Sequence, residues 1–219
     1  MRWLRVDTAH LLPEIRHELT DLLRGLTLDE WNAPTACGDW TVGDVASHLL
    51  GVELSNVARW RDGVAESRTV GNDIGEWLAE LNEQWVAAAR RLSPQLITDL
   101  IDMAAGWFEE HVATLELDAL EARVSWAGEE PAPVWMDVAR EYTERWVHQQ
   151  HIREAVDRPG LMEPRYLTAV LATFVHSVPV ALSEHGAPEG TGVELRMLGE
   201  GGNQTTVSAR AQTRSWTSG

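Results

Sequence analysis

Cysteine is almost absent from this chain, which has one, Cys37, in 219 residues. A single cysteine excludes an internal disulfide and every zinc motif built from several cysteines. No basic residue is adjacent to Cys37 in the sequence, and it stands four residues before a predicted helix cap at Thr41, so we interpret it as a packed structural thiol. The shortage of cysteine fits a reducing compartment, and we expect a cytoplasmic protein.

Positive charge and long hydrophobic runs are also scarce. The chain has 18 Lys and Arg against 34 Asp and Glu, a formal net charge of −16. Nucleic acids and anionic membranes both attract Lys and Arg, so we expect neither as a partner. The N-terminus lacks the apolar h-region of a signal peptide, and the apolar stretch VLATFVHSVPVAL is too short to span a bilayer. We expect a small-molecule substrate as the partner and leave a homodimer open.

Helical periodicity runs through most of the chain, and an apolar fraction of 44% is enough for a sizeable core. Thr41 with Asp44 predicts a capped helix start, and Ser93 with Pro94 predicts another. We therefore predict an all-α fold. The predicted helices cover residues 8–23, 41–60, 73–92, 94–115, 133–158 and 164–184.

The composition changes after His185. The sequence HGAPEGTG is typical of a linker, and VELRML and QTTVSARA around GEGGN predict a short β-hairpin. We therefore predict a helical domain over residues 1–187 and a linker with a hairpin tail over residues 188–219. A further stretch, EARVSWAGEEPAP, is predicted to be irregular or a short hairpin.

The strongest chemical signal lies in REYTERWVHQQHIREA, which carries Glu144, His148 and His151. Spacings of four and three residues place these side chains on one face of a helix. His48, at the edge of the apolar face of another helix, is a good candidate for a third ligand to join Glu144 and His148. Two imidazoles and one carboxylate form an open zinc triad, and nickel or iron would also accept them. The alternative is a solvated polar stripe beside a buried His48.

Residues near this motif have two interpretations each. Arg140 either binds a substrate carboxylate or pairs with a neighbouring acid, and Trp40 and Trp146 either line a substrate cleft or belong to the core. Asp44 either supports His48 or only caps its own helix.

Two motifs resemble the N-terminal domain of the mycothiol-dependent maleylpyruvate isomerase family, within the DinB/YfiT-like metal-dependent superfamily. The first is LTLDEWNAPTACGDWTVGDVASHLL, with its Cys-x-x-Trp-Thr-Val run and Val-Ala-x-His-Leu helix. The second is VSWAGEEPAPVWMDVAREYTERWVHQQHIREAV, with its Ala-Arg-x-x-Glu-x-x-x-His helix. The resemblance implies a four-helix bundle with an extra C-terminal helix. It also implies a divalent metal on His48, Glu144 and His148, and a thiol cofactor such as mycothiol.

The chain departs from this family at two places. The family usually has Asp where this chain has His151, which is a fourth ligand, an acid/base or supporting group, or a polar residue on the rim. Isomerases of the family also carry a C-terminal domain that contributes an active-site Arg, for which this chain offers Arg196, Arg210 or Arg214 without a motif that selects one.

Three functions follow from these observations. The first is a metal-dependent isomerase or S-transferase that uses a small thiol on an electrophilic substrate. The second is a metal-dependent hydrolase in which His151 shuttles a proton. The third is a non-catalytic bundle, a binding or stress protein with a vestigial metal site.

Overall fold

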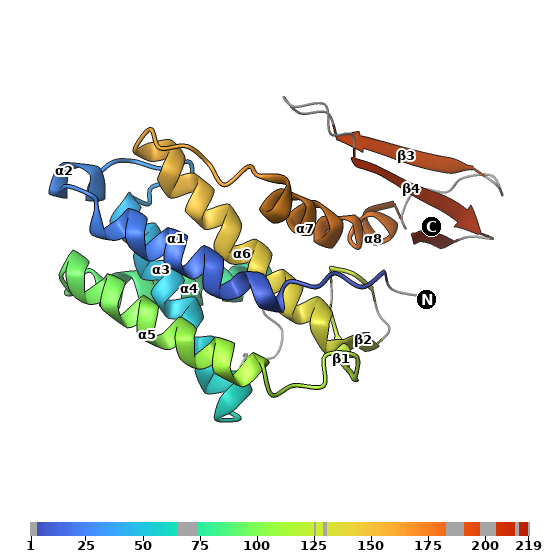
Figure 1. Cartoon of the computed structure of the whole chain (residues 1–219), viewed down its shortest axis with the longest axis horizontal. Coiled ribbons are helices and arrows are strands. Elements are labelled where there is room, and N and C mark those ends of the chain that lie inside the picture. The colour runs from blue at the N-terminus through green and yellow to red at the C-terminus, as the bar shows by residue number, and fades with distance from the viewer. Residues whose placement is uncertain are drawn as a thin grey trace. The chain divides into compact units, whose positions relative to one another are not determined.

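A computed structural model describes residues 4–64, 74–124, 126–128, 131–182, 191–197, 205–212 and 215–218. Helices dominate it, as predicted (Figure 1). They are α1 (Leu12–Arg24), α2 (Leu28–Trp31), α3 (Val42–Asn56), α4 (Ile74–Ala89), α5 (Pro94–Val112), α6 (Val134–Ala155), α7 (Pro164–Val175) and α8 (Val178–Leu182), with a 3-10 turn at Ala9–Leu11 and a π turn at Val57–Arg61.

The helix starts follow the sequence signals. Thr41 accepts a hydrogen bond from the Asp44 amide, and the Asp44 carboxylate accepts from the Thr41 amide, a complete capping box at the start of α3. Ser93 caps α5 with a single bond, in which its hydroxyl accepts from the Leu96 amide, and Pro94 lies in the first turn. These caps satisfy backbone N–H groups that a helix start would otherwise leave unpaired.

The chain forms two compact units, which α6 joins by contributing its first part to one and its second part to the other. One unit comprises residues 9–115 and 144–161, and we call it the bundle unit; the other comprises residues 1–8, 116–143 and 162–219. This division differs from the predicted boundary between residues 187 and 188, which stays a prediction, and the predicted linker lies mostly outside the described residues.

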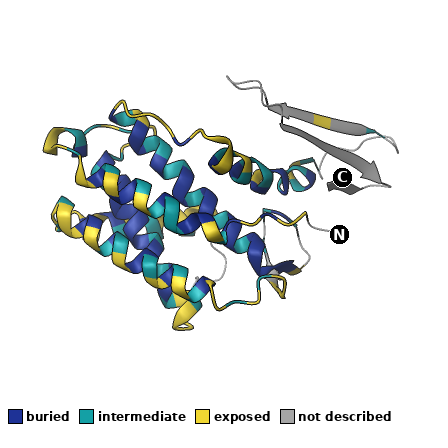
Figure 2. Ribbon diagram, viewed as in Figure 1, coloured by how far each residue is buried: buried dark blue, intermediate teal, exposed yellow. Residues whose placement is uncertain are grey.

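The bundle unit is held together by an apolar core around α3 (Figure 2). Helices α1, α4 and α5 pack against one another or against α3, and α6 joins them through contacts such as the Gln149 amide donating to the Ile15 carbonyl at 3.0 Å. Burial of this core is the main source of stability in such a fold. The fully buried members include Val42, Val45, Ala46, Leu49, Ile101 and Ile152.

The second unit contains two small antiparallel sheets. Strands β1 (Leu120–Arg123) and β2 (Pro131–Pro133) form the short hairpin that the sequence left open. Strands β3 (Gly192–Met197) and β4 (Thr205–Gln212) form the predicted tail hairpin. A third strand, β5 (Ser215–Ser218), pairs with β4 and was not predicted, because SWTSG is short and carries no turn signal before it.

The predicted last helix over residues 164–184 is wrong as a single element. It ends at Val175, and α8 starts at Val178. Pro179 explains the break, since its ring clashes with the carbonyl four residues earlier and it lacks an N–H. Taken as one stretch, Pro164–Leu182 has 19 residues and is apolar enough to cross a membrane, by length and composition only. Of the window that meets this criterion, 33% is buried inside the protein. The apolar stretch is therefore longer than predicted, but core helices of soluble proteins meet the same criterion.

Candidate metal centre

Helices α3 and α6 bring His48, Glu144 and His148 together. Helical spacing predicted the shared face of Glu144 and His148, and the family motifs added His48. Oε1 of Glu144 lies 3.0 Å from Nε2 of His48 and 3.2 Å from Nε2 of His148. The two imidazole rings meet edge to face, with centroids 4.6 Å apart. One ligand atom from each residue lies within 4.8 Å of the others. We call these three residues the triad.

These separations suit a tetrahedral metal. Bond lengths of about 2.0–2.2 Å to nitrogen and oxygen place two ligand atoms of a tetrahedron roughly 3.4 Å apart. The two distances from Oε1 of Glu144 to the imidazole nitrogens are slightly shorter than this, and they also fall in the hydrogen-bond range. The same geometry therefore allows the imidazoles to donate to Glu144 or all three groups to hold one ion. Their role as metal ligands stays a prediction.

The three side chains of the triad are buried to different extents, and the triad remains partly exposed to solvent. The side chain of His48 is 3% exposed, that of His148 is 17% exposed and that of Glu144 is 33% exposed. Burial alone would raise the pKa of Glu144, but hydrogen bonds from His148 and His48 outweigh it and hold that pKa well below its ordinary value. The carboxylate is therefore ionised and available as a ligand at neutral pH.

One atom of the triad is poorly satisfied. Nδ1 of His48 is buried and finds no hydrogen-bond partner in the described part of the chain. A buried polar atom without a partner costs free energy and is rare in native proteins, and a functional role is one of its explanations. The ring is held by its neighbours instead, since Trp40 packs on it with centroids 5.2 Å apart.

A tight loop between α2 and α3 carries Cys37 and Trp40 towards the triad. The Thr35 amide and hydroxyl both donate to the Trp40 carbonyl, at 3.1 and 2.7 Å, and the Cys37 amide donates to the Thr35 hydroxyl. The turn passes through Gly38 at φ +63°, a left-handed conformation that favours glycine. The loop therefore fixes the position of the one thiol in the chain.

The thiol meets two imidazoles, which the sequence did not predict. Sγ of Cys37 lies 2.9 Å from Nδ1 of His151 and 3.8 Å from Nδ1 of His148. Burial raises the pKa of the Cys37 thiol, and the charge of Glu144 adds to this. Burial lowers the pKa of His151, helped by the charge of His148. Cys37 has no basic sequence neighbour, so only its place in the Cys-x-x-Trp-Thr-Val motif pointed towards a site.

The predicted substrate-binding residues have different environments. Trp40 lies beside the triad, half-buried, and its Nε1 donates to Glu83 at 3.1 Å. Trp146 is 9% exposed and its Nε1 donates to the Leu161 carbonyl at 2.8 Å, which is the core role left open for it. Arg140 pairs with Asp137 at 2.8 Å and with Glu141, which is the ion-pair role left open for it. Substrate binding by any of the three stays a prediction.

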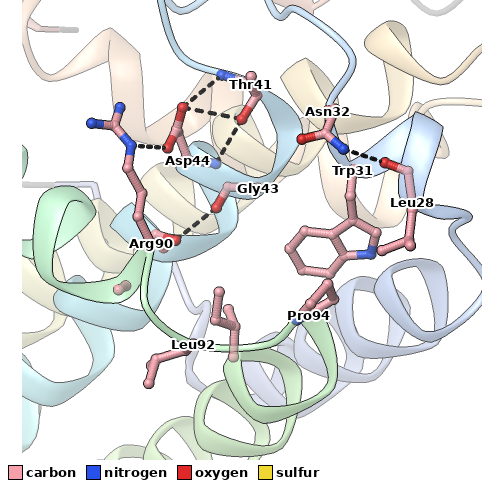
Figure 3. Close-up of a pocket in the computed structure, with 12 residues that line it drawn as sticks. Leu28, Trp31, Asn32, Thr41, Gly43, Asp44, Arg90, Leu92 and Pro94 are labelled. Atoms are coloured by element: carbon pink, nitrogen blue, oxygen red, sulfur yellow. Dashed lines mark hydrogen bonds and ion pairs between the residues drawn. The ribbon is translucent and has the colours of Figure 1, made fainter.

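Asp44 has a structural environment that needs no metal. Its carboxylate accepts from the Thr41 amide and hydroxyl and from Nε of Arg90 at 2.8 Å. It borders a cavity of about 440 Å³ between α2, α3 and the start of α5, where Trp31, Leu92 and Pro94 supply apolar walls (Figure 3). The helix-cap interpretation of Asp44 is therefore sufficient.

Comparison with known proteins gives a family match. Residues 12–153 match the family described as the mycothiol maleylpyruvate isomerase N-terminal domain, which confirms the resemblance of the two motifs. No curated protein matches the chain.

Two solved structures share the fold. One is a histidine-to-alanine mutant of a mycothiol-dependent maleylpyruvate isomerase, with a TM-score of 0.58 and 14% identity. The other is the mycothiol-dependent maleylpyruvate isomerase, with a TM-score of 0.55 and 16% identity. Each comparison covers 87% of this chain and 77% of the other. At such identities the likeness establishes the fold alone.

Proposed function

Because the chain belongs to the mycothiol maleylpyruvate isomerase N-terminal domain family, we propose that it is a divalent-metal-dependent enzyme that uses a low-molecular-weight thiol. The thiol is mycothiol or a close equivalent, the substrate is a small electrophile, and the reaction is an isomerisation or an S-transfer. Zinc is the metal we favour, with nickel and iron as the other candidates.

The convergence of His48, Glu144 and His148 is the observation that carries this proposal. Two imidazoles and one carboxylate form a donor set that suits zinc and leaves a coordination position for another group. The triad fits the metal because its ligand atoms are already at close to the required separations. A bound metal would supply a positive charge that lowers the pKa of a thiol.

The protein side chains supply orientation and proton handling. His48 is fixed by burial and by Trp40, so its Nε2 keeps its direction. Glu144 stays partly exposed and faces both imidazoles, so a small molecule can reach the group that holds them together. His151 is half-buried with a lowered pKa, so at neutral pH it is neutral and able to accept a proton.

Two of the three tail arginines offered for substrate recognition lie in described strands of the tail sheet. Arg196 lies in β3 and Arg210 in β4, while Arg214 lies outside the described residues. We propose that one of them or Arg140 binds a substrate carboxylate, since a guanidinium binds carboxylates with two parallel hydrogen bonds. Replacing each in turn by Lys should raise KM most for the residue that does so.

Metal analysis and a thiol-dependence assay test the proposal together. We expect one zinc, nickel or iron ion per purified wild-type chain and a strong loss of it in His48→Ala and in Glu144→Gln. We also expect turnover of maleylpyruvate, or S-conjugation of another small electrophile, only when mycothiol is added. His17→Ala is the matched control, because His17 is exposed on α1 and outside the triad.

Two outcomes would overturn the proposal. Full metal content in both triad variants would show that the triad is not the metal site. Metal-dependent turnover that needs no thiol would instead indicate a hydrolase.

A further inference from the structure

The two ring nitrogens of His148 face different groups. Its Nε2 lies 3.2 Å from Oε1 of Glu144, within the triad. Its Nδ1 lies 3.8 Å from Sγ of Cys37, which in turn lies 2.9 Å from Nδ1 of His151. The ligand atoms of Cys37, His148 and His151 all lie within 4.8 Å of one another. We call these three residues the sulfur set.

We propose that the sulfur set is a second metal site, selective for soft, thiolate-seeking ions, and that it competes with the triad for His148. The inference goes beyond the proposed function, because catalysis by the triad does not require it. Its donors are one sulfur and two nitrogens, whereas the triad offers two nitrogens and one oxygen. Softer ions favour thiolate, so the two sets differ in the ions they select.

The distances support coordination. Bond lengths of about 2.3 Å to sulfur and 2.0–2.1 Å to nitrogen place the two atoms roughly 3.6 Å apart around a tetrahedral ion. The two observed sulfur–nitrogen distances, 2.9 and 3.8 Å, lie on either side of this value. The loop bonds at Thr35 hold Cys37 in place, and all three residues are half-buried, so none of them is cut off from solvent.

Competition follows from the chemistry of the imidazole ring. A neutral imidazole carries a proton on one nitrogen and a lone pair on the other. When an ion binds Nδ1 of His148, the ring proton resides on Nε2 and is donated to Glu144. When an ion binds Nε2, the proton resides on Nδ1 and faces Cys37. Binding to the sulfur set also releases the thiol proton of Cys37 to solvent. His148 therefore serves one ion at a time.

Cadmium binding tests the proposal, because a thiolate bound to Cd²⁺ gives an ultraviolet charge-transfer band. Metal-free, fully reduced protein is titrated with Cd²⁺. We expect the band in the wild type and in His48→Ala, which disables the triad but leaves the sulfur set intact. We expect no band in Cys37→Ser. We expect Cd²⁺ affinity in His151→Ala to fall by more than the roughly 10–100-fold that loss of an outer-shell partner costs.

The controls separate this proposal from the proposed function. His17→Ala should bind Cd²⁺ like the wild type, and circular dichroism should confirm that each variant is folded. Absence of the band in the wild type would overturn the sulfur set. Loss of the band in His48→Ala would overturn it as a separate site and make Cys37 a ligand of the triad ion. Zinc analysis of Cys37→Ser tests the triad independently, since this variant should keep its zinc.

Discussion

Two consecutive residues of α6 make opposite kinds of contact with α3. Arg145 pairs with Glu53 at 2.7 Å, with side chains only 6% and 3% exposed, and its guanidinium also lies 4.9 Å from the ring centre of Phe108. Glu144 pairs with His48 at 3.0 Å but keeps a third of its side chain exposed. We call Arg145–Glu53 the sealed pair, because both side chains are buried. We call Glu144–His48 the open pair, because the Glu144 side chain is partly exposed to solvent.

The difference shows how one pair of helices combines a structural contact with a site. The sealed pair satisfies two buried charges, and each charge would be costly if the other were absent. The open pair contains an imidazole and a carboxylate, and the carboxylate side is exposed enough for water or an ion to reach it. Its hydrogen bonds can therefore be exchanged for metal bonds without leaving a buried charge alone. The sealed pair links α3 to α6 beside the triad, since Arg145 follows Glu144 directly in α6.

The largest stability effect should come from breaking the sealed pair. Glu53→Ala leaves Arg145 buried without this carboxylate, which typically costs about 3–5 kcal/mol. Urea unfolding should show this loss of unfolding free energy, while the metal content of the folded fraction stays close to wild type. The double replacement Glu53→Ala with Arg145→Met should recover much of the loss. A single variant as stable as wild type would contradict the role assigned to the pair.

The opposite result is expected from the triad, to which the open pair belongs. His148→Ala should reduce metal affinity by more than roughly 100-fold, because loss of a ligand exceeds loss of an outer-shell partner. The apolar core remains, so the variant should still unfold cooperatively, and chelation of the wild type should leave it folded. Equilibrium dialysis with zinc and thermal unfolding measure the two quantities. Cooperative unfolding on chelation alone would indicate a structural metal.

Much of the fold and of the triad could be predicted because the signals are local. Helical spacing places Glu144 and His148 on one face, and the capping box at Thr41 fixes where α3 starts and therefore where His48 lies. The family motifs connected the two helices, which spacing alone could not do. The break in the last helix was missed although Pro179 was visible, because the apolar pattern continues across it.

The sulfur set could not be predicted in this way. Cys37 lies more than a hundred residues from His148 and His151, and only the loop geometry around Gly38 brings it to them. Similarly, the spacing of Trp146 suited both a cleft wall and a core residue. Its hydrogen bond to the Leu161 carbonyl depends on how the chain returns after α6. Contacts of this kind are set by the tertiary fold and carry no local signal.

A smaller effect is expected at Gly51, which lies on α3 between His48 and Glu53. A Cβ added there would lie 2.5 Å from Cγ of Trp85, so α4 would have to shift. Overpacking of this kind costs about 1–3 kcal/mol, and Gly51→Ala should lower the unfolding free energy by that amount. Gly106→Ala is the matched control, because no atom of the described residues lies within 4 Å of its added Cβ. That variant should gain roughly 0.5–1 kcal/mol from helix propensity.

The smallest effect concerns Asp44, one turn before His48 on α3. Burial alone would raise the pKa of Asp44, but hydrogen bonds from Arg90 and Thr41 outweigh it and hold the pKa below the ordinary 3.8. A carboxyl with a lowered folded pKa contributes stability above its unfolded pKa and loses it as the pH falls through the folded value. Arg90 is half exposed, so we expect Asp44→Asn to cost about 1 kcal/mol or less at pH 7.

Urea unfolding of the wild type and Asp44→Asn as a function of pH checks this expectation. The difference in unfolding free energy should be constant above pH 3.8 and should shrink as the pH falls below it. Arg90→Ala should lose a similar amount, and the double variant should lose little more, because both replacements break one ion pair. Zinc content should not change in any of them. A loss of zinc in Asp44→Asn would instead show that Asp44 supports His48, and the structural role assigned to it would be wrong.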